Sequence, residues 1–331
     1  MKLYAPQYYK DFRCIAAACP DSCCKEWAVD VDPEAAAMYR KLPGDLGARL
    51  RSVLCDTDNG TVMQIEDGRC PMWRQDGLCR IHAELGHEAL CKTCQDFPRL
   101  RHDYGDFVEL GLELSCPEAA RLIFDGDGVL IAEEVPGDQV PEYDSEIMDI
   151  LLRNRDEILD LLKNPVFSIA EKLAIMLLRA HDAQAQIDGD SFIPFEPEAL
   201  LAEAKTYVQN SDLNSIFDFF QNLEILTERW ADLLKVVPEK IAWKNTLLPL
   251  VQYFVCRYWL QAVSDLDLVC RAKFVVCGCI MVAALGGIPA QTAQLFSKEI
   301  ENDPDNVETL LDGAYTSPAL TDANLFSLLL G

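Results

Sequence analysis

Cysteine is the residue type whose placement in this chain could carry chemistry. The stretch CIAAACPDSCCKEW, from Cys14 to Trp27, holds four cysteines within eleven residues, and ten of the 14 cysteines lie between Cys14 and Cys116. The N-terminal residues MKLYAPQYYKDF show no secretion signal, so we expect a cytoplasmic protein. Thiols stay reduced in that compartment, and a dense group of them binds metal or acts in catalysis more often than it forms disulfides.

Several of these cysteines lie beside residues that favour turns. Cys19, Cys70 and Cys116 are each followed by proline, and Cys91 and Cys94 form the motif CKTC. Turns let backbone amides point at sulfur, which stabilises metal-bound thiolates, and a two-residue gap lets two sulfurs reach one ion. Three readings stay open on spacing alone: an iron–sulfur cluster or iron, zinc, and structural free thiols or disulfides. Irregular all-cysteine spacing suits a cluster at least as well as zinc.

The composition limits the kinds of partner. A formal net charge of −25 disfavours binding to nucleic acid and to anionic membranes. The same charge would attract a cationic substrate, although it also serves solubility. The chain has no uncharged apolar run of about 18 residues, so we expect no transmembrane helix. The stretch FVVCGCIMVAALGGIPA, which begins at Phe274, indicates a buried helix instead.

The elements around the cysteines predict an irregular α+β module over residues 1–124. Asp32 followed by Pro33 is typical of a helix start. TVMQIE and DFVELGLEL alternate as strands do, and Gly77 indicates a tight turn. One helix is expected from about Ile81 to Cys91, and another from Pro117.

The remainder of the chain predicts a second domain, so the fold class is mainly α. Residues 125–143 are rich in glycine, proline and acidic residues and indicate a linker. Residues 144–331 show helical periodicity almost throughout, which predicts an all-α domain of roughly eight helices. The last of these are expected at 240–262, 265–285 and 289–302. The cysteines of this domain are expected to be small buried hydrophobes: Cys256, Cys270, Cys277 and Cys279.

Three stretches carry a family resemblance: YYKDFRCIAAACPDSCCKEWAVDVD, GRCPMWRQDGLCRIHAELGHEALCKTCQDFPR and LELSCPEAARLI. They resemble the flagellin lysine-N-methylase family, whose N-terminal part is similar to a cysteine-rich module described as zinc- or iron-chelating. The motifs of that module occur here in order: a close cysteine group, Cys-Pro-x-apolar, Cys-x-Ile and Cys-x-x-Phe-Pro. The resemblance covers about residues 4–124.

The resemblance implies a protein-lysine N-methyltransferase that transfers methyl groups from S-adenosyl-L-methionine (SAM) to flagellin and carries a [4Fe-4S] cluster, with zinc as the alternative metal. Cys91 ranks below the other candidates, and Cys55 matches no motif. The metal ligands that the resemblance implies are Cys14, Cys19, Cys23, Cys24, Cys70, Cys79, Cys94 and Cys116.

Two departures leave the mechanism open. No glycine-rich turn joins a strand to a helix, as a Rossmann-type methyltransferase requires. Cys19 and Cys23 form CxxxC, but the next position of the radical-enzyme motif holds Glu26 instead of cysteine. We therefore assign no catalytic or SAM-binding residue, and we expect both substrate sites near the junction of the two domains. The alternative function is a metal-binding module that stores, delivers or senses iron or zinc, with the helical domain docking a partner.

Residues near the motifs have plainer interpretations as well. Asp21 is expected to cap a turn, and Trp27 to form an apolar wall near the metal site. Tyr8, Tyr9 and Tyr104 could line a lysine channel, since aromatic faces attract ammonium groups, but core packing is the better interpretation of each.

Overall fold

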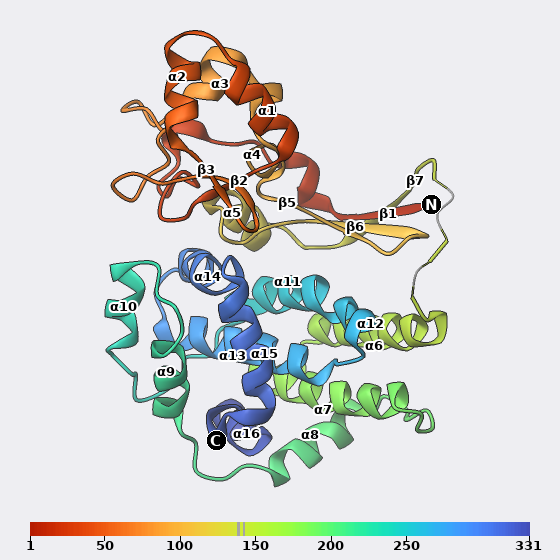
Figure 1. The fold of residues 1–331 in the computed structure, drawn as a ribbon. Coiled ribbons are helices and arrows are strands. Elements are labelled where there is room, and N and C mark those ends of the chain that lie inside the picture. The colour runs from red at the N-terminus through yellow and green to blue at the C-terminus, as the bar shows by residue number, and fades with distance from the viewer. Residues whose placement is uncertain (138–139, 142) are drawn as a thin grey trace.

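The computed structural model describes residues 1–137, 140–141 and 143–331. The fold is mainly α, as predicted, and the strands of the described residues lie within the first 134 positions (Figure 1). Two sheets and short helices occupy the predicted N-terminal module, residues 1–124, and one strand of the larger sheet, Leu130–Glu134, lies beyond it. The helical domain, residues 144–331, lies beneath them in Figure 1.

A four-stranded sheet joins the two ends of the cysteine-rich region. Its order is β5-β6-β1-β7, with β1 parallel to β6 and antiparallel to β7. Leu3 of β1 lies opposite Val108 of β6 and Glu133 of β7. The first residues of the chain are therefore held beside strands that follow most of the cysteines. The strands are β1 (Lys2–Pro6), β5 (Arg99–Asp103), β6 (Phe107–Leu112) and β7 (Leu130–Glu134).

A second, antiparallel sheet of order β2-β4-β3 packs with the short helices of the module. The predicted start of α1 is confirmed: the Asp32 carboxylate accepts a hydrogen bond from the Ala35 amide at 2.9 Å, with Pro33 in the first turn. Gly77 has the predicted turn conformation, with φ of 80°. These elements are β2 (Val29–Val31), β3 (Leu54–Thr57), β4 (Gly60–Met63), α1 (Pro33–Lys41) and α2 (Gly44–Val53). Helix α5 (Pro117–Asp125) packs elsewhere, in a core shared with the helical domain.

The helix expected from Ile81 to Cys91 is wrong in its extent. Helix α3 (Arg80–Leu85) ends where Gly86 adopts φ of 90°, a conformation that glycine reaches at little cost. A 3-10 turn and the short helix α4 (Lys92–Asp96) follow. The break places Cys91 at the start of a new helix instead of the end of an old one.

Strand β7 lies inside the segment 125–143 that the sequence indicates as a linker. Its pairing with β1 gives this segment a structural role in the sheet. Positions 138–139 and 142 of the segment lie outside the described residues.

The helical domain begins at α6. Helix α13 contains the apolar stretch at Phe274 and is buried on nearly all sides, so the prediction of a buried helix is confirmed. None of the helices in the described part of the chain has the length and apolar character needed to cross a bilayer. The helices are α6 (Ser145–Lys163), α7 (Ile169–Ile187), α8 (Pro197–Thr206), α9 (Leu213–Gln221), α10 (Glu228–Leu234), α11 (Leu248–Tyr258), α12 (Ala262–Asp265), α13 (Val269–Leu285), α14 (Pro289–Phe296), α15 (Pro304–Thr316) and α16 (Asp322–Leu330).

Two expectations about these helices are corrected. The sequence predicted a single helix at 240–262, but the structure has a 3-10 turn, α11, a second 3-10 turn and α12 in this region. Helix α11 starts beside Pro249, because proline is suited to the first turn of a helix. The helix predicted at 289–302 is α14 followed by a π-helical turn, Ser297–Glu301. Helices α15 and α16 were not expected, so the described residues contain more helices than the roughly eight predicted. The cap Asp303 followed by Pro304 is a recognisable start signal for α15.

The apolar residues form two cores. The larger one contains Phe12, Leu112 and Ile123 from the module together with Leu151 and Phe254 from the helical domain. The smaller one is confined to residues 29–91. The four-stranded sheet and α5 thus share a core with the helical domain, whereas the intervening cysteine-rich region has a core of its own.

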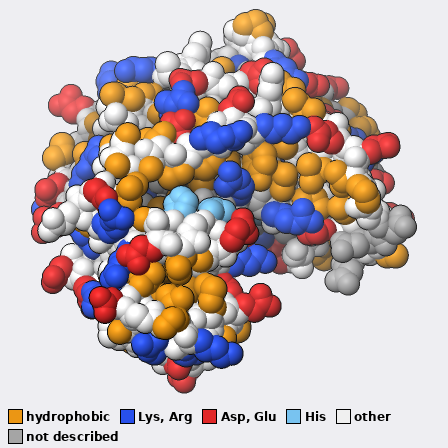
Figure 2. All heavy atoms as spheres, turned by 90° about the horizontal axis from the view of Figure 1, so that it is seen from above, with side chains coloured by type: hydrophobic (Ala, Val, Ile, Leu, Met, Phe, Trp, Pro, Cys, Tyr) orange, Lys and Arg blue, Asp and Glu red, His pale blue; other side chains and the backbone are white. Residues whose placement is uncertain are grey.

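The negative charge is concentrated on the second part of the chain. Residues 1–124 contain 15 Lys and Arg against 20 Asp and Glu, whereas residues 125–331 contain 14 against 34. On the face viewed from above the module, basic side chains border an area of hydrophobic ones (Figure 2). An attraction for cationic ligands therefore belongs mainly to the helical domain.

Candidate metal centre

The first cysteine loop runs between the end of β1 and β2. A 3-10 turn, Ala16–Ala18, separates Cys14 from Cys19. The Ala16 amide donates to Cys14 Sγ at 3.4 Å, and Cys19 Sγ donates to the Asp21 carbonyl at 3.1 Å. The backbone of this loop therefore points a donor at one sulfur, as turns beside metal-binding thiols do.

Cys24 is the centre of a group of three sulfurs. Its sulfur accepts hydrogen bonds from the thiols of Cys23 and Cys70, which holds the pKa of Cys24 well below its usual range. The same bonds raise the pKa values of Cys23 and Cys70. The Cys70 amide donates to the Cys24 carbonyl at 2.8 Å and fixes the two backbones together. Thiolate is the form that binds metal, and the lowered pKa of Cys24 favours that form.

Cys91 and Cys94 form a second pair at the start of α4. The Cys94 thiol donates to the Cys91 sulfur, which lowers the pKa of Cys91 and raises that of Cys94. Cys91 is buried, with 2% of its surface exposed. The sequence ranked Cys91 below the other cysteines, whereas the structure joins it directly to a predicted ligand; the CKTC spacing was the signal for this contact.

The two groups of thiols lie within electrostatic reach of each other. Burial raises the pKa of Cys79, and the charges of Cys24 and Cys91 raise it further. The charges of Cys24 and Cys23 likewise raise the pKa of Cys94. These five sulfurs, with Cys70, therefore share one electrostatic neighbourhood around the small core.

The remaining predicted ligands lie on the side of α5. Burial raises the pKa of Cys116 to about 11, and the charges of Cys19 and Cys14 add to that shift. The charges of Cys14 and Cys116 also raise the pKa of Cys23, so Cys23 connects both groups. The structure thus brings the eight predicted ligands and Cys91 into one region. Cys55 lies elsewhere, on β3, where its thiol donates to Gln64.

These sulfurs do not converge on one point. Within residues 1–137, 140–141 and 143–331, no three Cys, His, Asp or Glu side chains are placed to hold a single metal ion. A cluster is ligated by thiolates that bind different iron atoms, so its ligands need not meet at one ion. Cysteine thiolates are the usual ligands of iron–sulfur clusters, so these thiols are chemically suited to hold one.

The candidate centre lies at the border of the two cores. Cys24, Cys70, Cys79 and Cys91 pack against the small core, whereas Cys116 packs against the large one. Cys70 Sγ contacts the Met63 sulfur at 3.6 Å. The candidate thiols therefore lie where the two cores meet.

Asp21 and Trp27 have contacts that the sequence did not predict. The Asp21 carboxylate does not cap a turn: it accepts hydrogen bonds from Lys298, at 3.0 and 2.9 Å, and from Gln294, at 3.1 Å. The Trp27 ring centroid lies 5.3 Å from Lys298 Nζ. Glu26, which stands where a radical enzyme carries cysteine, also pairs with Lys298. No local sequence signal connects these residues, since more than 270 positions separate Asp21 from both partners.

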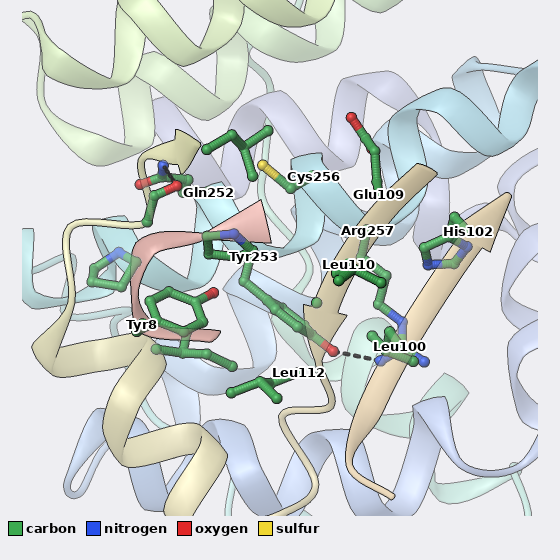
Figure 3. Close-up of a pocket in the computed structure, with 16 residues that line it drawn as sticks. Tyr8, Leu100, His102, Glu109, Leu110, Leu112, Gln252, Tyr253, Cys256 and Arg257 are labelled. Carbon is green, nitrogen blue, oxygen red and sulfur yellow. Dashed lines mark hydrogen bonds between the residues drawn. The ribbon is translucent and has the colours of Figure 1, made fainter. Parts of the chain in front are cut away.

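A cavity of about 40 Å³ lies at the junction where we expected the substrate sites, between the four-stranded sheet and α11 (Figure 3). Its lining includes His102 and Glu109 from the sheet and Tyr253 and Arg257 from α11. Arg257 donates to the Tyr253 hydroxyl at 2.6 Å. This volume accommodates a few water molecules and is too small for SAM.

The three tyrosines considered for a lysine channel differ, and Tyr9 is partly buried against the large core. Tyr8 is buried in the large core and borders the small cavity, so its role is packing. Tyr104 stacks on Phe107 with ring centroids 4.8 Å apart and also lines a hollow of about 570 Å³ with Asp103 and Tyr143. The hollow lies at the far end of β5 from the cysteine motif that precedes this strand.

Comparison with known proteins finds relatives for part of the chain. The flagellar biosynthetic protein FliU of Salmonella muenchen is 32% identical over 140 residues, which cover 39% of this chain and 81% of FliU. Lysine-N-methylases of Salmonella choleraesuis and Salmonella typhimurium are 33% and 32% identical over 138 and 137 residues. The chain spans about a third of the length of each lysine-N-methylase, with 34% of either one matched.

No protein-family model and no solved structure matches the chain. The relation to FliU combines 32% identity with coverage of 81% of that protein. On this basis the chain belongs to the family of the flagellar biosynthetic protein FliU.

Proposed function

We propose that this protein is a protein-lysine N-methyltransferase that acts on flagellin. The observation that carries the proposal is the similarity to two lysine-N-methylases over 137–138 residues, together with the relation to a flagellar biosynthetic protein. The cysteine motifs support it, because the thiols that these motifs supply share one region of the structure. A purely structural role would not require nine thiols in contact or in electrostatic reach of one another.

The proposed cofactors are SAM, as methyl donor, and a [4Fe-4S] cluster. The candidates for holding the cluster are the eight predicted cysteines and Cys91. A bound cluster of this kind supplies redox chemistry or a Lewis-acidic iron. Zinc is the less favoured metal, because a structural zinc site is tetrahedral and closed, and the thiols do not converge on one ion within the described residues.

The chain's own residues would prepare the substrate. The attacking atom is a lysine ε-nitrogen, which is a nucleophile only when neutral, and burial beside apolar groups lowers an ammonium pKa. The acidic helical domain favours the approach of the charged lysine, and the apolar border of the thiol region favours its loss of a proton. Screening at physiological salt limits this electrostatic attraction to a distance of about 8 Å.

The test uses flagellin, SAM and anaerobically purified protein, with methyl-lysine measured by mass spectrometry. We expect methylated flagellin from the parent protein, none from Cys24→Ser, and parent-like activity from Cys55→Ser, which removes a thiol outside the group. Iron and acid-labile sulfide should accompany the active protein. Stoichiometric zinc without acid-labile sulfide would contradict the proposed iron–sulfur cluster.

A thermal-unfolding measurement with and without SAM separates an enzyme from a metal-storage protein. A SAM-dependent rise in melting temperature is expected for a methyltransferase, because a ligand that binds only the folded state stabilises it. Protein that holds iron, shows no shift with SAM and leaves flagellin unmodified would contradict the proposed activity.

A further inference from the structure

The helical domain reaches the first cysteine loop through two side chains, Gln294 at the end of α14 and Lys298 in the π-helical turn. We propose that these are positioning residues that close the Cys19–Cys24 loop against Cys116 and so complete the metal centre. This inference rests on the proposed function for the identity of the metal, although the closure itself is a property of the metal-free chain.

Lys298 is a buried cation held by the cysteine loop. Its side chain is 2% exposed, and its Nζ pairs with both Asp21 oxygens, at 3.0 and 2.9 Å, and with Glu26. The Trp27 ring covers the same ammonium. A buried charge is stable only when paired, so this lysine depends on the loop and the loop on this lysine. Burial lowers the Lys298 pKa, but the two carboxylates outweigh burial and leave it raised.

Gln294 ties the same loop to the last predicted ligand. Its side-chain amide donates to Asp21 at 3.1 Å and to the Ser115 carbonyl at 2.8 Å. Asp21 lies between Cys19 and Cys23, and Ser115 immediately precedes Cys116. One amide group therefore connects the two chain segments whose sulfurs raise each other's pKa.

The π-helical turn explains how one segment makes these contacts. All five residues from Ser297 to Glu301 are buried, and three of them are charged. Lys298 points to the module, Glu299 accepts from the Leu226 amide at 2.8 Å, and Glu301 accepts from the Tyr258 hydroxyl at 2.7 Å. A π turn is uncommon and marks functional positions more often than regular helix does. Here it directs neighbouring charges to three different parts of the fold.

The backbone of Glu26 has an unfavourable conformation, which indicates that contacts from outside the loop stabilise it. Its φ of 74° lies in the left-handed region, which is unfavourable for a residue with a side chain. The ion pair with Lys298 is the contact from the helical domain that restrains this residue. Release of Lys298 should therefore allow the loop to relax and move its cysteines.

The experiment compares full-length Lys298→Met, Asp21→Asn and Lys298→Arg with the parent protein. In metal-free protein, the rate at which iodoacetamide modifies Cys19 and Cys24 is measured by mass spectrometry, with Cys55 as the internal reference. We expect about a fivefold increase for Lys298→Met, the change for an ion pair whose carboxylates stay partly hydrated. Asp21→Asn should behave similarly, and Lys298→Arg, which keeps the charge, should restore most of the protection.

The second readout is the iron bound per folded chain after anaerobic reconstitution, with its visible and EPR spectra. Lys298→Met should bind less than about half the iron of the parent protein and show an altered spectrum. The matched control is Lys273→Met. Lys273 is also a buried lysine, 7% exposed and paired with Asp322 at 3.0 Å. It lies within α13 and donates to the Ala314 carbonyl, away from the cysteine loop. It should lose stability while keeping its iron and its slow alkylation.

The two readouts separate the two proposals. If the parent protein binds no iron but Lys298→Met exposes Cys19 and Cys24, the metal proposal fails and the closure stands. If Lys298→Met keeps parent-like alkylation and iron, or if Lys273→Met changes both as strongly, the positioning role is refuted.

Discussion

The ion pair between Arg155 and Glu109 should be the most costly single contact to break between the module and the helical domain. Arg155 of α6 donates two hydrogen bonds to the Glu109 carboxylate of β6, at 2.8 and 2.7 Å. Their side chains are 5% and 7% exposed. Arg155→Met leaves a buried carboxylate without its partner, and such changes cost about 3–5 kcal/mol in the free energy of unfolding. Because both side chains are almost fully buried, solvent screening does not reduce this cost.

The measurement is urea unfolding followed by circular dichroism and by tryptophan fluorescence. Both probes should report one transition, because the sheet shares its core with the helical domain. The matched control is Arg121→Met, which removes the same type of side chain from an exposed pair with Glu118 and Asp125. An exposed pair contributes about 0–1 kcal/mol, so this variant should stay close to the parent protein.

A double variant gives a second check on Arg155→Met. The double variant Arg155→Met/Glu109→Leu should regain most of the loss. A cost below about 1 kcal/mol, or a double variant no better than the single one, would refute this account of the contact.

Two further predictions follow from the candidate centre and the cavity beside the sheet. Cys91→Ser should reduce the iron content of the protein, because its sulfur is paired with Cys94 and lies within electrostatic reach of Cys79, whereas Cys55→Ser should leave iron content unchanged. Equal iron in both variants would remove Cys91 from the ligand candidates. Burial and the nearby Arg257 lower the pKa of His102 below 6.5, so the parent protein should lose stability as pH falls from about 6.5 through that lowered pKa. His102→Gln should lack this part of the pH dependence, and melting temperatures between pH 7.5 and 5 that run parallel for both proteins would contradict it.

The sequence alone determined much of the local structure and the identity of the thiols. The start of α1 at Asp32 and the strand from Phe107 follow from capping and alternation, which act over a few residues. The grouping of Cys23 with Cys24, and the contact of Cys91 with Cys94, follow from short spacings that leave the sulfurs little freedom. Motif order indicated which other cysteines belong with them.

Tertiary structure alone decided which charges hold the module to the helical domain. Nothing in the spacing of Asp21 and Lys298, or of Glu109 and Arg155, predicts that they meet, because a solvated charge and a buried paired charge have the same appearance in a sequence. Helical periodicity shows that a face is buried but not which surface covers it. The division into two cores, with the sheet on the side of the helices, is therefore a consequence of how the two surfaces pack, and it places the cysteines at their border.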